Sequence, residues 1–292
     1  MKTVIGDRTG SAAADTAGAQ LVSLRDAEGC EYLWQGDPKY WSGQAPILFP
    51  IVGSLRNNRT VVRGKNYDML RHGFARRMKF ERATSSGNSV SYFLKSNEET
   101  KKQYPFDFEF TVFYRFRKRT LSVGFTVRNT GSETMPCAVG GHPAFNCPLE
   151  KGERFEDYDV VFSREETVSC PRLEPETGLL DLNNRTPLLR EQSVLPMRHG
   201  LFAGDALVFE SLRSNSVSLR NRNTGHGVRL GFADFPFLGI WSAANDAPFV
   251  ALEPWTGCAT ATDESDDLFQ KRAMTLLEPG QSRSVGFILS FF

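Results

Sequence analysis

The clearest structural pattern of this chain lies in residues 108–127, which read FEFTVFYRFRKRTLSVGFTV. Large apolar side chains occupy every second position from Phe108 to Phe116, and again from Leu121 to Val127. This period of two is typical of strands that bury one face against a core. The basic turn between the two runs joins them, and the whole stretch therefore predicts a β-hairpin.

The same alternation recurs along the chain, whereas helical periodicity is almost absent. Further strands are predicted at 158–162, 217–219, 228–232 and 285–291. One short helix is expected after Ser96, because Ser96 and Glu99 have the spacing of a capping box, and it must end before Pro105. Many strands joined by Gly- and Asn-containing turns predict an all-β fold, a large antiparallel β-sandwich with few short helices.

The chain has 292 residues, which is enough for one large β domain or for two ordinary domains. No low-complexity linker and no repeat of fixed period divides it. The polar, proline-containing region 171–196 is expected to be an irregular excursion rather than a domain boundary. We therefore expect a single domain over residues 1–292.

Composition excludes several classes of protein. Hydrophobic residues make up 40% of the chain and the formal net charge is only +1, so neither disorder nor a nucleic-acid partner is expected. No run approaches the ~20 apolar residues that cross a bilayer, and no signal peptide is visible, so we expect a cytoplasmic protein without a membrane partner. The five cysteines form no CxxC pair and are expected to be mostly buried thiols, with neither zinc nor disulfides.

Two segments combine proton-transferring side chains with unusual surroundings. Residues 140–145, GGHPAF, place His142 in a turn framed by glycine and proline, and residues 249–255, FVALEPW, place Glu253 at the end of an apolar run. Imidazole and carboxylate groups are the side chains that most readily move protons near neutral pH. The structural alternatives are a hydrogen-bonded turn histidine and a salt bridge at a strand end.

Other polar residues are weaker candidates. His72 precedes a glycine, which would let the backbone approach a ligand closely, and Asp205 precedes an apolar run. Arg56 and Arg76 could hold hydroxyl groups or a phosphate. Each of these four residues can equally be a structural turn or surface residue. The motifs of serine hydrolases, P-loop proteins and dinucleotide-binding proteins are missing.

Four motifs in the same order resemble the aldose 1-epimerase (mutarotase) family, and within it the bacterial LacX-like branch. They are residues 40–53, 72–76, 140–145 and 253–257. The resemblance extends from about Leu21 to the C-terminus. It implies a galactose-mutarotase-like β-supersandwich with an open sugar cleft.

The resemblance also implies roles for individual residues. Glu253 matches the general base of the family and His142 its general acid. His72 matches a second histidine that binds and polarises the substrate, and Asp205 matches an aspartate that binds sugar hydroxyls. No metal and no cofactor is implied.

Two arginines match different branches of the family. Arg76 falls where the hexose-6-phosphate branch has an arginine after its His-Gly motif, and Arg56 matches a sugar-binding arginine of the galactose branch. The phosphate-sugar branch also has an arginine before its proline-apolar-Phe-Pro segment. Residues 41–45, WSGQA, contain no basic residue at that place, which argues against phosphate recognition.

The expected function is therefore that of an isomerase that interconverts the α and β anomers of a hexose by opening and closing its ring. In this scheme Glu253 starts as a carboxylate, and its charge raises the pKa of His142 so that the histidine starts as an imidazolium. The alternatives are a non-catalytic carbohydrate-binding or sugar-sensing protein, a hexose-6-phosphate 1-epimerase, and a hydrolase or lyase. The expected partner is a small sugar, free or phosphorylated, and the chain is expected to be a monomer or homodimer.

Overall fold

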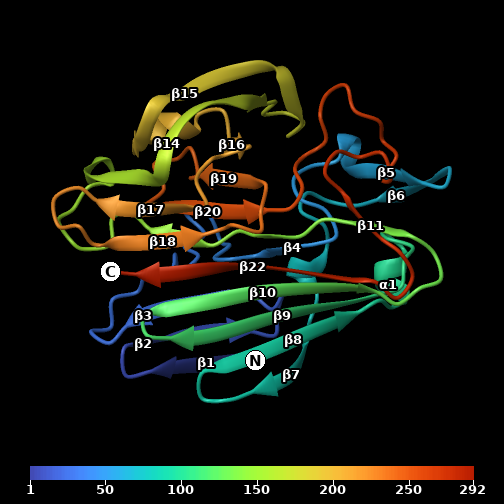
Figure 1. Cartoon of the computed structure of the whole chain (residues 1–292), viewed down its shortest axis with the longest axis horizontal. Coiled ribbons are helices and arrows are strands. Elements are labelled where there is room, and N and C mark those ends of the chain that lie inside the picture. The colour runs from blue at the N-terminus through green and yellow to red at the C-terminus, as the bar shows by residue number, and fades with distance from the viewer.

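The computed structural model describes all residues from 1 to 292, and β-strands dominate it (Figure 1). Strands account for 51% of the chain and helices for 6%, which confirms the all-β prediction. None of the helices has the length and apolar character needed to cross a membrane.

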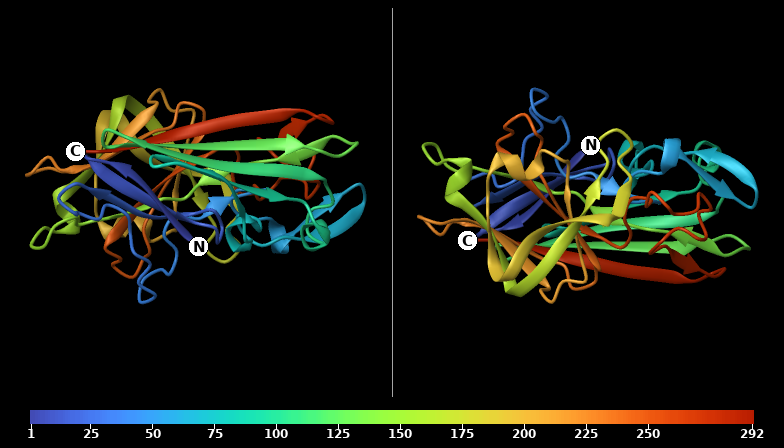
Figure 2. Two further views of the ribbon diagram at one scale, coloured as in Figure 1. Left: turned by 90° about the horizontal axis from the view of Figure 1, so that it is seen from below. Right: turned by 90° about the horizontal axis from the view of Figure 1, so that it is seen from above.

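The largest sheet has nine antiparallel strands, and the 108–127 hairpin lies within it. In order across the sheet these are β15 (Leu180–Pro196), β14 (Tyr158–Leu173), β17 (Ser216–Asn221), β18 (Gly227–Gly231), β22 (Ser282–Phe291), β10 (Thr120–Asn129), β9 (Phe108–Arg117), β8 (Ser89–Lys95) and β7 (Glu81–Ser85). Leu121 pairs with Phe116 across the predicted turn. The long strands β9, β10 and β22 run side by side (Figure 2), and all the strands predicted from the sequence are present.

A second sheet of six short strands carries Glu253, and His142 follows directly after one of its strands. In order these strands are β16 (Leu207–Glu210), β19 (Phe237–Trp241), β20 (Phe249–Trp255), β12 (Gly140–Gly141) and β4 (Ile47–Leu48), with β13 (Ala144–Asn146) also paired to β20. Every residue of β20 is buried. The strand is therefore apolar along its length rather than alternating, because both of its faces are covered.

The remaining elements are small. They are the sheet β1 (Lys2–Asp7), β2 (Gly10–Asp15) and β3 (Leu21–Asp26), the pairs β5 (Arg59–Val62) with β6 (Lys65–Asp68) and β11 (Met135–Cys137) with β21 (Thr275–Leu277), the helix α1 (Glu98–Lys101), and the 3-10 turns η1 (Arg56–Asn58), η2 (Ala75–Arg77), η3 (Phe155–Asp157) and η4 (His199–Phe202).

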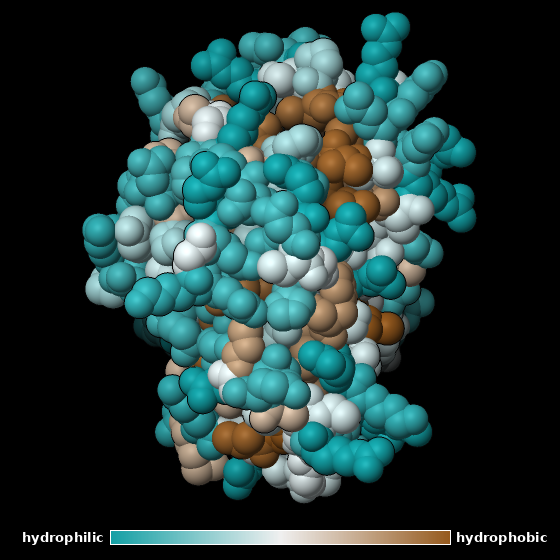
Figure 3. All heavy atoms as spheres, turned by 90° about the vertical axis from the view of Figure 1, so that its left-hand side faces the viewer, coloured by the Kyte–Doolittle hydropathy of each residue, from teal (hydrophilic) through white to brown (hydrophobic).

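One continuous core of 63 buried side chains joins the two large sheets. Phe49, directly after β4, illustrates the contact, because its ring stacks on that of Phe110 from β9 at 4.6 Å between centroids. The inward-facing side chains of the 108–127 hairpin are all part of this core. On the face drawn in Figure 3 the surface is mostly hydrophilic, with apolar groups showing in small areas between polar side chains.

The structure corrects two local predictions. The short helix begins one residue later than expected, because Asn97 rather than Ser96 is its N-cap and exchanges hydrogen bonds with Thr100. The region 171–196 is not an irregular excursion, since most of it is strand β15 and the end of β14. Four register shifts interrupt their pairing, and an exposed edge strand carries little alternation from which it could be recognised.

Candidate active site

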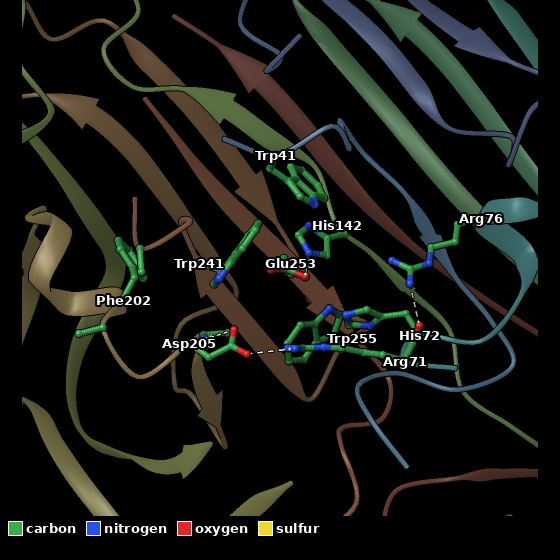
Figure 4. Close-up of a pocket in the computed structure, with 13 residues that line it drawn as sticks. Trp41, Arg71, His72, Arg76, His142, Phe202, Asp205, Trp241, Glu253 and Trp255 are labelled. Carbon is green, nitrogen blue, oxygen red and sulfur yellow. Dashed lines mark hydrogen bonds and ion pairs between the residues drawn. The ribbon is translucent and has the colours of Figure 1, made fainter. Parts of the chain in front are cut away.

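A cavity of about 390 Å³ opens beside the six-stranded sheet (Figure 4). It is lined by Trp41, Arg71, His72, Arg76, His142, Phe202, Ala203, Asp205, Ala206, Trp241, Ala244, Glu253 and Trp255. The size is typical of a small-molecule site, and so is the mixture of aromatic walls with a few polar groups. Six residues were candidates from the sequence. The cavity therefore brings together five of them, and Arg56 lies elsewhere.

Glycines allow the chain to place His142 beside β20. Gly140 pairs with Leu48 on one side and with Trp255 on the other. A Cβ atom on Gly140 would lie 2.7 Å from the indole of Trp255, so no larger residue fits there without movement. The backbone N–H of His142 then donates to the carbonyl of Pro46 at 3.1 Å, which fixes the turn that carries the imidazole.

Glu253 reaches the cavity from the buried strand β20, where it pairs with Gly239. Its residue surface is only 1% exposed. The Nε2 atom of His142 lies 3.2 Å from the Oε2 atom of Glu253. Oε2 is buried without a well-formed hydrogen bond, and the imidazole of His142 and the indole of Trp255 are the side-chain donors beside this carboxyl group.

Burial sets the protonation of this pair. It lowers the pKa of His142 to about 3, and it raises the pKa of Glu253 well above its ordinary range. Both directions follow from the cost of placing a charge where water is excluded. Both groups therefore favour their uncharged forms, in which the pair holds one proton.

The expectation that Glu253 would keep His142 charged is thus wrong for the empty pocket. The reason lies in aromatic neighbours that the local sequence does not reveal. The Trp41 ring stacks on the imidazole at 4.9 Å between centroids, and Trp241 meets it edge-on at 5.5 Å. These rings exclude water from His142, and the cost of losing hydration outweighs the attraction of one carboxylate.

His72 is held in a strained turn next to the first histidine. Its φ angle of +68° is unusual for a residue other than glycine. Its backbone N–H donates to the carbonyl of Gly53 at 2.9 Å, and its Nδ1 atom accepts from the N–H of Gly53 at 3.1 Å. Because Nδ1 accepts, the proton of the neutral ring is on Nε2. Burial also lowers the pKa of His72 well below its ordinary value, so the ring offers one N–H donor.

An ion pair closes one side of the cavity. The Nη1 atom of Arg71 lies 3.0 Å from Oδ2 of Asp205, and the other carboxylate oxygen of Asp205 accepts from the N–H of Ala206. Arg71 did not stand out in the sequence analysis. Its position directly before His72 could have indicated it, because adjacent residues lie in the same turn.

Arg76 brings a second positive charge to the cavity wall. Its Nη2 atom donates to the backbone carbonyl of Arg71 at 3.0 Å, and its Nε atom is buried without a partner. Burial lowers the pKa of Arg76 to about 10, with smaller contributions from the neighbouring arginines. No carboxylate lies within ion-pair distance of this guanidinium, whereas Arg71 is paired.

The structure does not bring Arg56 to the cavity. Its guanidinium donates to the carbonyls of Ala261, Thr262 and Glu264, and it pairs with Asp266 at 2.6 Å. All of these partners belong to the segment that follows β20. Arg56 therefore has no free donor near a sugar, because its hydrogen bonds are taken by the protein itself.

Comparisons with known proteins agree with this geometry. The family model described as aldose 1-epimerase matches residues 1–290. The chain is 46% identical to the chromosomal protein LacX of Lactococcus lactis over 270 residues, which is 90% of each chain. It superimposes on a galactose mutarotase related enzyme from Lactobacillus acidophilus with a TM-score of 0.94 and 38% identity, covering 100% of this chain and 97% of the other.

A second solved structure, a galactose mutarotase-like protein from Lactobacillus casei, gives a TM-score of 0.91 at 30% identity, with both chains covered completely. Together the comparisons confirm the family resemblance and the galactose-mutarotase-like fold.

Proposed function

Because this chain belongs to the aldose 1-epimerase family, we propose that it interconverts the α and β anomers of a hexose through Glu253 and His142. The observation that carries the proposal is the buried pair itself, 3.2 Å apart at the wall of a sugar-sized cavity. The two atoms that exchange protons in ring opening, O1 and O5, are both bonded to C1. Two side chains in contact with each other can therefore exchange protons with O1 and O5 at the same time.

The proton transfers require only one proton on the Glu253–His142 pair. In the closed-ring complex Glu253 takes the proton of the C1 hydroxyl while His142 gives its proton to the ring oxygen, so that the C1–O5 bond breaks and an aldehyde forms. After rotation about the C1–C2 bond, His142 takes the proton back from O5 and Glu253 returns one to O1. The pair thus alternates between an ionic and a neutral form, and its total charge never changes.

Burial favours the neutral form of the pair in the empty cavity, so the bound sugar has to stabilise the ionic form. Nearby groups are suited to that task. The Nε2–H of His72 can donate to a sugar oxygen, and Asp205 and Arg71 can accept from and donate to neighbouring hydroxyls. The aromatic walls at Trp41 and Trp255 can pack against the apolar face of the pyranose.

The direct test is the rate at which freshly dissolved α-glucose or α-galactose reaches anomeric equilibrium, followed by polarimetry with and without protein. We expect acceleration over buffer that scales with protein concentration and saturates with sugar. Saturable sugar binding without acceleration would instead support the alternative of a carbohydrate-binding or sugar-sensing protein.

The pH dependence of kcat/KM reports the protonation of the free protein. We expect no loss of kcat/KM as the pH falls through ~6.5, where an ordinary histidine titrates. The acid limb is expected only as the pH approaches about 3, because below the pKa of His142 the pair gains a second proton and loses its base. The alkaline limb begins where Glu253 loses its proton, above its ordinary range. An acid limb at the ordinary value for histidine, with kcat/KM falling as the pH drops through it, would contradict the shared-proton description.

One observation favours a phosphorylated hexose as a second candidate substrate. Arg76 presents a guanidinium without a carboxylate partner at the cavity wall, and such a group is suited to a phosphate. We expect Arg76→Met to lower kcat/KM for a hexose 6-phosphate at least tenfold more than for the free hexose, if the phosphate contacts this side chain. Arg77→Met, at the neighbouring position and outside the cavity lining, is the control. An equal effect on both sugars would exclude phosphate binding by Arg76.

A further inference from the structure

Arg56 lies outside the cavity, yet it binds the segment that directly follows the residues packed against Gly53 and Ser54. One guanidinium holds the carbonyls of Ala261, Thr262 and Glu264, and pairs with Asp266. Its side chain is only 28% exposed. A guanidinium presents its donors in a rigid planar fork. This side chain therefore ties together four points of the 261–266 segment, in addition to the backbone bonds that the segment makes with Val61 and Leu180.

This segment continues directly from residues that contact Gly53. The N–H of Thr260 donates to the carbonyl of Ser54 at 2.9 Å. A Cβ atom on Gly53 would lie 2.5 Å from the backbone of Ala259, so the two backbones are packed with no space between them. The position of Gly53 therefore depends on where residues 259 and 260 lie.

Gly53 in turn determines how the His72 ring is held. The two residues exchange hydrogen bonds, from the N–H of His72 to the carbonyl of Gly53 and from the N–H of Gly53 to Nδ1 of His72. The second bond orients the ring and places its proton on Nε2. Without that donor the imidazole can adopt the other tautomer, which offers a lone pair from Nε2 instead of an N–H.

We propose that Arg56 is a positioning residue for His72, acting through the 259–266 segment and Gly53. Its effect on turnover rests on the proposed function, because it requires that His72 donates to the sugar. Arg56 thus takes part in substrate recognition indirectly, by fixing the backbone donor that keeps the proton of His72 on Nε2.

The kinetic test is a double-mutant cycle of Arg56→Met with His72→Gln, measured as kcat and KM for anomer interconversion. We expect Arg56→Met alone to lower kcat/KM about tenfold, and the same change in the His72→Gln background to have less than a twofold effect, because coupled residues are not additive. Equal losses in both backgrounds would overturn the proposal. Arg59→Met removes a nearby arginine that pairs with Asp68 on the surface, and it should leave both constants unchanged.

A second readout does not depend on turnover. The ring ¹⁵N and ¹³C shifts of His72 report its tautomer, and the assignment is simple because the chain has four histidines. We expect a single Nε2–H tautomer in the wild type and a mixture in Arg56→Met, and an unchanged single tautomer in that variant would overturn the proposal. If the wild type does not accelerate mutarotation, this measurement still decides the role of Arg56. If Arg56→Met does not fold, Arg56→Lys, which keeps the charge without the fork, takes its place in both measurements.

Discussion

Replacing Glu253 by glutamine should reduce the catalysed rate of anomer interconversion by roughly 100- to 10,000-fold, the usual worth of one positioned acid–base group. The amide has nearly the shape of the carboxyl group but can neither take the proton of the C1 hydroxyl nor return it. Sugar binding should change much less, because the cavity walls stay in place. Polarimetry gives the rate, and calorimetric titration with the sugar gives the affinity.

The stability of Glu253→Gln provides an internal check on the cause of that loss. Burial raises the pKa of Glu253, so its contribution to stability is fully present below the pKa of the unfolded chain and is lost as the pH rises toward the folded value. The variant should therefore unfold at a temperature equal to or above that of the wild type, by a margin that grows with pH. Glu166→Gln is the matched control for changing a buried carboxyl group outside the pair. Glu166 is also buried, but it accepts hydrogen bonds from the backbone N–H groups of Arg213 and Ser214.

Near-wild-type rates of anomer interconversion in Glu253→Gln would remove Glu253 from the mechanism.

Replacing His142 by asparagine should have an effect of the same order on the rate. The imidazole is the partner that exchanges protons with O5, and its Nε2 atom is the one that lies 3.2 Å from Glu253. Because each transfer to or from the sugar by one residue is matched by a transfer at the other, losing either one disables its partner. Polarimetry or exchange NMR at saturating sugar measures the loss of rate.

The double variant Glu253→Gln, His142→Asn then distinguishes a pair from two independent groups. We expect it to be no slower than the worse single variant, because groups that act as a unit are not additive. Rates that multiply, so that the double variant loses the product of both factors, would show that the residues act separately.

The local sequence was sufficient for the all-β class and for the long hairpin, because the alternation of apolar and polar side chains lies within each segment. The period of two in residues 108–127 corresponds directly to β9 and β10. The strand β15 was missed for the opposite reason. It forms an exposed edge with an irregular register, and its side chains carry little information about burial.

The site was only partly predictable, because its electrostatics depend on residues far apart in the chain. Trp41 and Trp241 are about a hundred positions from His142, and their contact with the imidazole reverses the expected direction of its pKa. Arg56 shows the same limitation. Its residue type fitted a sugar-binding role, whereas its partners lie in a loop some two hundred residues later.

The most direct test of this account is an experimental structure of the protein with a bound aldose. We expect the anomeric carbon to lie between the two side chains, with O1 at ~2.6–3.2 Å from the Glu253 carboxyl group and O5 at a similar distance from Nε2 of His142. A pyranose bound with its anomeric carbon toward Asp205 or toward solvent, so that neither O1 nor O5 contacts the pair, would contradict it.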